Sequence, residues 1–504
     1  MKIKLGLDFG TYRSFLAVFE PNKQHPEVVV PMDRTSCLSG IPSLFYASRD
    51  GEISLCDEAE NFETYDTQGL VRSIKMHFRN HENITLYGNS YSTKEIAKQI
   101  IEKVLSISFN TLHENYIEDD EIDRQMVIGV PISFGAYEKN IITEIITELG
   151  FEPELLPEPM AAALHYADST GKKFDQVMVF DMGAGTFDTA LLKTNNTQSF
   201  VDPHPYKVEG FNGNRQAGDA IDKAFAEYII NHKITDPVVR ENLQNTNSTE
   251  YRHLLLGAKR IKERLSLSEQ FADLISVGGR SVTVSVTRDE FNEAAIPIIK
   301  EAIDICKGVI GSNVHNNLTI LMVGGSSYSP IVKQELEKAF PKFNIIRRNP
   351  EKAVALGCAV YASQPKSFQR KVAFGYAIET FAYNNVSGKD ELVLCVEIPS
   401  DVPLPYQITS DYYTRHNNQS SVAFKVYEIP GAELGEKYPL TKGKALDQVE
   451  LKHFFGKPVP QRTKVKLTTE LTESGTLKMT ADDGGISKNS SSSKEFSLGT
   501  GTYR

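Results

Sequence analysis

Short apolar runs of strand-forming residues alternate with segments of helical periodicity along roughly the first 360 residues. In "NIITEIITELG" (140–150) the apolar side chains fall on one helix face, and Gly150 stands where a C-terminal cap belongs. In "SPIVKQELEKAF" Ser329 is placed to cap a helix whose first residue is Pro330. Alternating strands and helices predict an α/β domain.

From about residue 372 the pattern changes to strands alone, separated by Asp, Asn, Gly and Pro. Between the two patterns, "SQPKSFQRK" is polar and contains a proline. We therefore expect an α/β domain over 1–363, a linker over 364–371 and a β-rich, sandwich-like domain over 372–504, with "KEFSL" near the end as a closing strand. The strand-like runs are "VAFGYAIETFAY", "ELVLCVEIP", "QSSVAFKVYEI", "KVKLTTELT" and "GTLKMTA".

One turn design occurs twice, in "LGLDFGTYRSFLAVF" (5–19) and in "MVFDMGAGTFDTALL" (178–192). In each copy an apolar strand ends in an aspartate, and a glycine-containing turn leads into a second apolar strand. The free N–H groups of such a turn suit a phosphate. Asp8 and Asp181 could hold a hydrated Mg²⁺, and Thr11 and Thr186 add hydroxyls. The alternative is a tight Asp-Gly hairpin with only a folding role, which a single copy would favour.

A third glycine turn lies in "TILMVGGSSYSPIV", where Gly324 and Gly325 separate an apolar strand from the helix predicted after Ser329. A strand, a glycine turn and a helix N-terminus let the backbone approach a phosphate or a ribose closely. Alone this pair of glycines is weak evidence for a binding site. Together with the two aspartate turns, it is a candidate for the part of the site that binds the nucleoside end of a ligand.

Composition narrows the function classes. The 504 residues are 40% hydrophobic and 24% charged, which is typical of a globular protein of several domains. The net charge of −10 and the lack of basic runs disfavour nucleic acid as a partner. No apolar stretch is long enough to span a membrane, and "MKIKLGLDFG" is unlike a signal peptide, so we expect a cytoplasmic protein. The five cysteines are scattered without metal-site spacing and are expected to be mostly buried.

The collinear segments "GLDFGT", "VIGVPISFGAYEKN", "LLPEPMAAALHYA", "FDMGAGTFDTALL", "LMVGGSSYSPIV" and "NPEKAVALGCAVYA" resemble the nucleotide-binding domain of DnaK-type chaperones, the heat shock protein 70 family. "GYAIETF" and "NNQSSVAFKVYE" are similar, more weakly, to that family's substrate-binding β-domain. The resemblance implies a duplicated actin-like ATPase fold of two lobes and four subdomains. It also implies binding of ATP or ADP with Mg²⁺, slow hydrolysis, unfolded or extended apolar peptides as clients, and J-domain or nucleotide-exchange co-chaperones.

The resemblance also assigns roles to residues at matching positions. Lys75, Glu158, Asp181 and Thr186 match catalytic positions, with Arg72 competing with Lys75 for the alignment, and Asp8, Asp181 and Glu158 match those that place the metal through water. Without the family, Glu158 would be a solvated acid at a helix start, and Lys262 and Ser266 would be a polar helix face. The nucleotide-binding positions are Gly10, Thr11, Tyr12, Gly183, Ala184, Gly185, Thr186, Gly218, Lys262, Ser266, Gly324, Gly325, Ser326 and Tyr328.

In the β-rich part, Phe381, Val422 and Phe424 match positions that line the family's peptide groove. The alternating Val422 and Phe424 could equally face a sandwich core. The chain stops where the family's helical lid would begin, so the resemblance implies a lidless member.

The chain also departs from the family. Tyr12, followed by Arg13, replaces a threonine of the first turn, and Tyr328 replaces an arginine after the third. Glu263 stands at a basic position facing the adenine, and Ala184 replaces a glycine. In the linker, Arg370 falls where the family carries an acid, which affects coupling between the two domains.

We therefore expect a DnaK-type chaperone with weak ATPase activity. The alternative is a nucleotide-binding interaction or regulatory module with weak or no hydrolysis and no coupling between domains. A small-molecule kinase of the same superfamily is disfavoured by the β-rich C-terminal part.

Overall fold

The computed structural model describes residues 2–31, 40–64, 66–80, 83–171, 174–194, 205–246, 248–277, 280–311, 317–364, 372, 374–384, 388–400, 402–472, 476–486 and 491–497. The expected linker, including Arg370, lies outside these residues except for Gln364. Contacts divide the chain into two compact units, residues 1–133 with 145–367 and residues 134–144 with 368–504.

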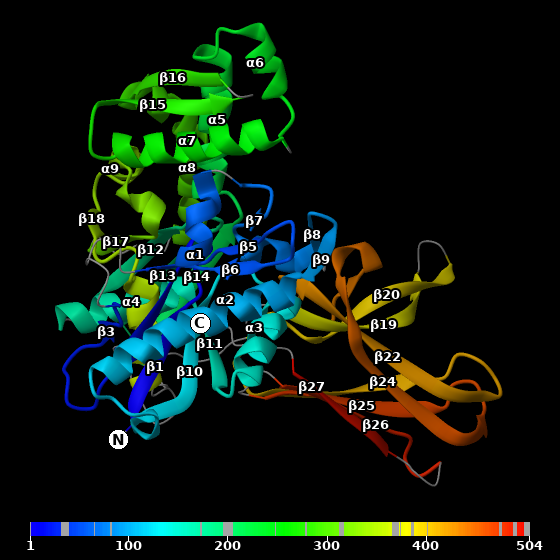
Figure 1. Cartoon of the computed structure of the whole chain (residues 1–504). Coiled ribbons are helices and arrows are strands. Elements are labelled where there is room, and N and C mark those ends of the chain that lie inside the picture. The colour runs from blue at the N-terminus through cyan, green and yellow to red at the C-terminus, as the bar shows by residue number, and fades with distance from the viewer. Residues whose placement is uncertain are drawn as a thin grey trace. The chain divides into compact units, whose positions relative to one another are not determined.

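The first unit contains two large sheets with the same strand order and directions (Figure 1). In each, a central strand pairs antiparallel with the next strand along the chain and parallel with a later one. The first sheet has the order β11-β10-β1-β2-β3, with β4 pairing β2, and the second has the order β14-β13-β12-β17-β18. The strands are β1 (Ile3–Asp8), β2 (Arg13–Phe19), β3 (Glu27–Val28), β4 (Ile41–Pro42), β10 (Ile122–Val130), β11 (Glu152–Pro157), β12 (Gln176–Met182), β13 (Phe187–Thr194), β14 (Tyr206–Asn214), β17 (Leu318–Val323) and β18 (Asn344–Arg347).

Two buried helices lie between these sheets. Helix α10 (Ala353–Ser363) packs on β1 and β10, α4 (Glu158–Thr170) packs on β12, and the two helices pack on each other. A side chain at Gly357 of α10 would place its Cβ 1.7 Å from the carbonyl oxygen of Ala161 in α4, so only glycine permits this approach. The close packing of α4 and α10 fixes the ends of β1 and β12 relative to each other.

The remaining elements of this unit surround the sheets. Smaller sheets are formed by β5 (Phe45–Ala47), β6 (Ile53–Leu55) and β7 (Leu70–Val71), by β8 (Asn83–Leu86) and β9 (Asn89–Ser92), and by β15 (Gln270–Val277) and β16 (Arg280–Thr287). The helices are α1 (Asp57–Glu60), α2 (Thr93–Glu114), α5 (Gly218–His232), α6 (Pro237–Asn242), α7 (Thr249–Leu265), α8 (Arg288–Ile310) and α9 (Pro330–Ala339), and the 3₁₀ turns are η2 (Asn61–Thr64), η3 (Ile74–Asn80), η4 (Asp119–Glu121) and η5 (Gly325–Tyr328). Helix α3 (Ala136–Glu148) is divided between the units, with residues 136–144 in the second and 145–148 in the first.

The helices predicted from periodicity are confirmed. In α3, Ile142, Ile145 and Ile146 are buried, and Gly150 has a positive φ of 89° just after the helix. In α9, Pro330 is the first residue and Ser329 is at the N-cap, but the serine side chain makes no capping hydrogen bond.

The second unit contains two antiparallel sheets whose facing side chains form one core. The five predicted strands are present, and "KEFSL" overlaps the last strand, β27. Strands β21 and β24 were not expected from the sequence. The five-stranded sheet has β19 (Phe374–Asn384), β20 (Lys389–Ile398), β22 (Gln419–Pro430), β23 (Lys437–Tyr438) and β24 (Lys444–Val459), with the 3₁₀ turn η6 (Leu440–Lys442), and the other has β21 (Tyr406–Tyr413), β25 (Lys464–Leu471), β26 (Thr476–Asp482) and β27 (Ser491–Ser497).

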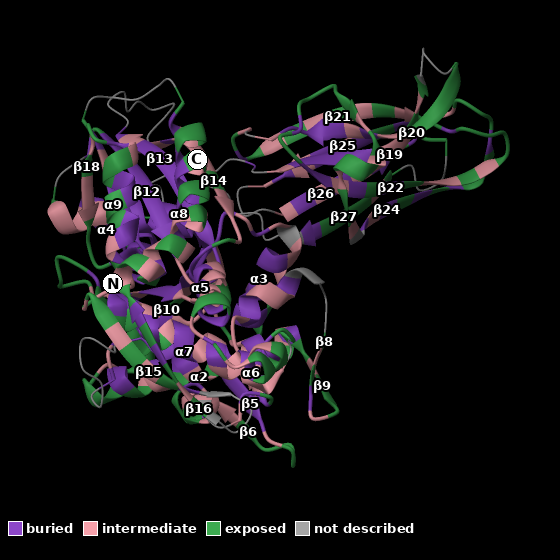
Figure 2. Cartoon of the chain, turned by 90° about the horizontal axis from the view of Figure 1, so that it is seen from above, coloured by how far each residue is buried: buried purple, intermediate pink, exposed green. Residues whose placement is uncertain are grey.

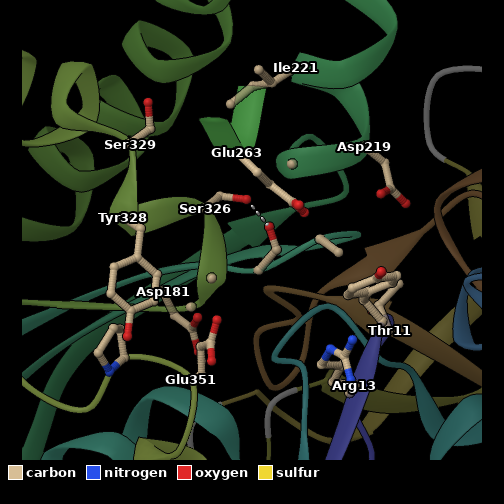
Figure 3. Close-up of a pocket in the computed structure, with 18 of the residues that line it drawn as sticks. Thr11, Arg13, Asp181, Asp219, Ile221, Glu263, Ser326, Tyr328, Ser329 and Glu351 are labelled. Atoms are coloured by element: carbon tan, nitrogen blue, oxygen red, sulfur yellow. Dashed lines mark hydrogen bonds between the residues drawn. The ribbon is translucent and has the colours of Figure 1, made fainter. Parts of the chain in front are cut away.

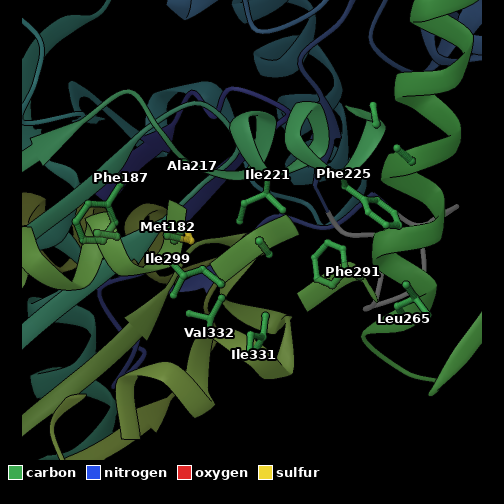
Figure 4. Packing of buried hydrophobic residues seen from close by; sticks show 14 of the residues in the cluster. Met182, Phe187, Ala217, Ile221, Phe225, Leu265, Phe291, Ile299, Ile331 and Val332 are labelled. Carbon is green, nitrogen blue, oxygen red and sulfur yellow. The ribbon is translucent and has the colours of Figure 1, made fainter. Parts of the chain in front are cut away.

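Burial follows these layers, and the central strands β12 and β13 are buried over nearly their whole length (Figure 2). A large apolar cluster joins α5 to α8 and α9, where Ile221, Phe291 and Ile331 lie close together (Figure 4). The described cysteines Cys56, Cys306 and Cys358 are buried, whereas Cys395 is half-buried.

Candidate functional site

A cavity of about 640 Å³ opens in the first unit where the three glycine turns meet (Figure 3). Its apolar wall is the edge of the cluster that includes Ile221, Phe291 and Ile331. Nearly all predicted catalytic and nucleotide-binding residues line it. These are Asp8, Gly10, Thr11, Tyr12, Lys75, Glu158, Asp181, Gly183, Ala184, Thr186, Gly218, Lys262, Ser266, Gly324, Gly325, Ser326 and Tyr328.

The two aspartate turns face each other. Gly185, the one predicted nucleotide-binding residue outside the lining, lies on the second turn, and a Cβ there would be 3.1 Å from Cγ2 of Thr11 on the first. The second turn is closed by a hydrogen bond of 3.1 Å from the N–H of Gly183 to the carbonyl oxygen of Thr186. Strand–turn–strand segments distant in sequence therefore meet at one place.

The third glycine turn packs against the second and is hydrogen-bonded to it. Gly324 has a φ of 81°, and a Cβ there would be 2.3 Å from the carbonyl oxygen of Met182. The carbonyl oxygen of Gly183 accepts hydrogen bonds from the Ser326 hydroxyl at 2.7 Å and from the N–H of Gly218 at 3.1 Å (Figure 3). A side chain at Gly324 would clash with the Met182 carbonyl, and one at Gly218 would clash with the Ser326 hydroxyl, so glycine is required at both positions.

A cluster of charged side chains lies at the bottom of the cavity. The Lys75 ammonium donates to Oε1 of Glu158 at 2.9 Å, and both side chains are buried. Burial and the nearby Glu158 raise the pKa of Asp8 to about 7, although Lys75 opposes this. Burial, with Glu158 and other carboxylates, also raises the pKa of Asp181 well above its usual value. Carboxylates therefore outnumber the cations at this point.

Asp188 belongs to this cluster, although it was not singled out from the sequence. It lies opposite Asp181 in the β12–β13 pairing, and burial together with Glu158 raises its pKa to about 7. Its Oδ1 accepts from the N–H of Ile132 at 2.9 Å, and its buried Oδ2 has no hydrogen-bond partner among the described residues. The sequence feature that could have indicated Asp188 is the second aspartate in "FDMGAGTFD", because antiparallel pairing across a tight turn places it beside the first.

Among the described residues, no group of three or more His, Cys, Asp or Glu side chains is arranged to bind a metal ion directly. The sequence predicts contact through water, which places carboxylates farther from the ion than direct ligation does.

The departures in the first turn have defined contacts. The Lys259 ammonium lies 2.9 Å from the centroid of the Tyr12 ring, which is a cation–π contact. Burial lowers the pKa of Lys259 to about 8. The guanidinium of Arg13 donates to the carbonyl oxygen of Gly40 at 2.8 Å and pairs with Glu60 at 2.9 Å. Arg13 is thereby fixed by protein groups, so we attribute no phosphate contact to it.

Arg72 and Lys75, which compete for one catalytic position in the resemblance, have different surroundings. Arg72 pairs with Glu63 and is not part of the lining, whereas Lys75 is. Lys262 pairs with Asp222 at 2.6 Å. Other lining residues were not singled out as candidates from the sequence, because helical or loop positions alone gave no signal. They include Asp219, Asp222, Lys259, Arg347 and Glu351.

The three predicted peptide-binding residues differ in burial. Phe381 is 46% exposed, and the guanidinium carbon of Arg415 lies 3.6 Å from its ring centroid. Phe424 is 3% exposed and packs edge-on against Tyr412 in the core between the sheets. Val422 is half-buried against the same core. The core interpretation therefore describes Phe424, and of the three only Phe381 is largely exposed.

The mixed α/β architecture with its glycine-turn cavity is consistent with an ATPase fold of the Hsp70 type. A family model described as "Hsp70 protein" matches residues 79–499. This match covers well over half of the chain, so the chain belongs to the Hsp70 family. Membership supports a chaperone-type function with nucleotide binding. Within the part of the chain that the structure describes, no helix combines the length and apolar character needed to span a membrane.

Proposed function

We propose that this protein is a DnaK-type molecular chaperone that binds ATP, hydrolyses it slowly and binds extended apolar peptide segments. The observation that carries the proposal is the meeting of three glycine turns at one cavity, which Lys75 also lines. The repeated strand order of the two large sheets supports a duplicated actin-like fold over 1–363. The common core of the two later sheets supports a β-sandwich substrate-binding domain over 372–504.

In this proposal the phosphates lie between the two aspartate turns. Backbone N–H groups of the turns and the hydroxyls of Thr11 and Thr186 face them, which is the chemistry that such anion-binding turns supply. Lys75 reaches the same place from η3, where its point charge stabilises transferring phosphoryl oxygens. The nucleoside would then contact the apolar wall of the cavity and Ser266.

The carboxylate cluster fits a hydrated divalent cation. Burial, and after it the neighbouring Glu158, raises the pKa values of Asp8, Asp181 and Asp188, and Oδ2 of Asp188 lacks a partner among the described residues. Asp8, Asp181 and Glu158 would hold Mg²⁺ through water. When bound, the ion would neutralise phosphate charge. The protein's own part is to hold these carboxylates in place, and a bound cation would favour their ionised form.

The peptide surface is proposed on the β19–β20 hairpin. Phe381 and Leu392 are cross-strand partners, Tyr383 follows on the same face, and all three are exposed. An apolar face of this kind suits an extended apolar peptide.

The test is ATP turnover together with fluorescent-peptide affinity, measured with and without ATP, in the wild type and in Lys75→Ala. Loss of a positive charge at the reacting phosphate is expected to lower turnover by about 10²- to 10³-fold. The control is Lys103→Ala, because Lys103 also pairs with a glutamate, at 3.2 Å, but does not line the cavity. The coupled-chaperone proposal fails if ATP binds without changing peptide affinity.

The alternative is a nucleotide-binding regulatory module with weak or no hydrolysis. The Lys75–Glu158 ion pair favours it, since a lysine already neutralised by a glutamate stabilises phosphoryl oxygens less. Nucleotide-dependent stabilisation without turnover, in the wild type and in Lys75→Ala alike, would support this module.

A further inference from the structure

Three side chains of the second unit form a hydrogen-bonded chain, and none of them lines the cavity of the first unit. Nδ1 of His453 in β24 lies 3.0 Å from Oγ of Ser492 in β27, and its Nε2 lies 3.2 Å from Oδ2 of Asp483, which follows β26. Strands β24 and β27 belong to different sheets and contact each other. The fold therefore brings together a serine, a histidine and an aspartate from three separate segments.

The hydrogen bonds of Asp483 fix the direction of this chain. Its Oδ1 accepts from the N–H groups of Gly485 and Ile486, each at 3.1 Å. An ionised carboxylate can only accept hydrogen bonds, so Nε2 of His453 must donate to Oδ2. In a neutral imidazole the other nitrogen is then an acceptor, so the Ser492 hydroxyl donates to Nδ1.

Of the three side chains, the serine is the one that a molecule from solvent can reach. The side chains of His453 and Asp483 have no exposed surface. The His453 ring also packs edge-on against Phe455, with the ring centroids 5.3 Å apart. Ser492 is half-buried. The imidazole is thus held by a carboxylate and an aromatic ring, with its free acceptor turned to the serine.

A serine hydroxyl that donates to an imidazole backed by a buried carboxylate is the arrangement that activates a nucleophile. The imidazole takes the hydroxyl proton as the oxygen attacks, and the carboxylate stabilises the imidazolium that forms. In the common triad Nε2 faces the serine and Nδ1 the aspartate, whereas here the two nitrogens are exchanged. Either nitrogen can accept the proton, so the exchange preserves the chemistry.

We propose that Ser492 is a nucleophile that takes the acyl group of small activated esters, with His453 as general base and Asp483 as the positioning residue that orients the imidazole. The serine oxygen bonds to the carbonyl carbon while its proton moves to Nδ1 of His453. The bond to the leaving alcohol then breaks as Nδ1 gives the proton to the alcohol oxygen. Water attacks the acyl-serine by the same route, which releases the carboxylic acid and restores the serine.

Two features set the class of substrate. The half-buried position of Ser492 favours a small acyl group. An activated ester suits the site because its leaving group departs readily. The reaction uses no residue of the cavity, so it stands or fails independently of the proposed function.

The test treats the full chain, without nucleotide, with a fluorophosphonate probe and with p-nitrophenyl acetate. Peptide mass spectrometry of the wild type should find the phosphonyl group on Ser492, and Ser492→Ala should lose it together with ester hydrolysis. Asp483→Asn should lower kcat by about 10²- to 10⁴-fold at unchanged KM, because an amide that donates to Nε2 leaves the proton on Nδ1. A merely structural role would not produce this split in a variant that melting curves show to be folded.

Ser493→Ala is the matched control. Ser493 is the next residue along β27, is exposed, and its Oγ lies 2.9 Å from Oγ1 of Thr480. This variant should react as the wild type does, and wild type unfolded in urea should not be labelled at Ser492. A folded wild type without label at Ser492, or equal rates in the wild type and Asp483→Asn, would overturn the proposal.

Discussion

Replacing Asp8 by asparagine is expected to stabilise the ligand-free protein at alkaline pH. Burial and Glu158 raise the pKa of Asp8 from 3.8 to about 7, so ionisation of this group opposes folding. Asparagine has nearly the same shape and carries no charge. Asp8, which the proposed function needs as a carboxylate, therefore destabilises the ligand-free protein when it is ionised.

The magnitude follows from the pKa difference. One pKa unit corresponds to about 1.4 kcal/mol, so a rise from 3.8 to about 7 corresponds to about 4 kcal/mol. In the folded state the proton is retained between these two pH values, while the unfolded chain has lost it. The contribution to stability is thus fully present below pH 3.8 and is lost as pH rises to about 7. Asp8→Asn should gain up to about 4 kcal/mol over the wild type at pH 8.

Urea unfolding at pH 4.5, 6 and 8 in EDTA without nucleotide measures this difference, with far-UV circular dichroism as the probe because the chain has no tryptophan. Asp304→Asn is the control, since Asp304 has a side chain that is 70% exposed. Adding Mg²⁺ and ATP should stabilise the wild type more than Asp8→Asn. If Asp8→Asn is less stable than the wild type at pH 8, or if its advantage does not grow with pH, the argument from crowded carboxylates is refuted.

Five further substitutions test the packing, the proposed peptide surface and a buried group of hydrogen bonds. Gly324→Ala should destabilise the protein by more than about 1–3 kcal/mol and abolish nucleotide-dependent stabilisation, because φ is positive there and the new Cβ would clash with the backbone. Gly308→Ala in α8 is the control, because a Cβ there meets open space; it should stabilise the protein by up to about 1 kcal/mol in a melting assay. Phe381→Ala should weaken binding of a fluorescent peptide with under about 0.5 kcal/mol of stability change, whereas Phe424→Ala should cost about 3–5 kcal/mol in urea unfolding. Asp483→Ala should lower the free energy of unfolding by about 1–3 kcal/mol, because the Asp483 carboxylate accepts hydrogen bonds from a buried histidine at 3.2 Å and from two backbone N–H groups. A variant as stable as the wild type would show that these hydrogen bonds make no net contribution to stability.

Elements with strong local signals were predictable. The strands before Asp8 and Asp181, the helix that begins at Pro330 and the strands around "VAFGYAIETFAY" follow period and turn chemistry that a few neighbouring residues specify. Strand β24 was missed because its sixteen residues, "KALDQVELKHFFGKPV", mix lysines and a histidine with apolar residues and contain a glycine. The pairing with β22 has register shifts, so its alternation is interrupted.

The sequence by itself determined the three glycine turns, their order and the family, because these depend on residue types at fixed local spacing. Only the tertiary structure decided that Asp188 joins the carboxylate cluster, that Arg13 is held by Gly40 and Glu60, and that Arg347 lies over Tyr328. Each of these contacts joins different elements of the fold, and spacing along the sequence does not encode which side chains strand pairing and helix packing bring together.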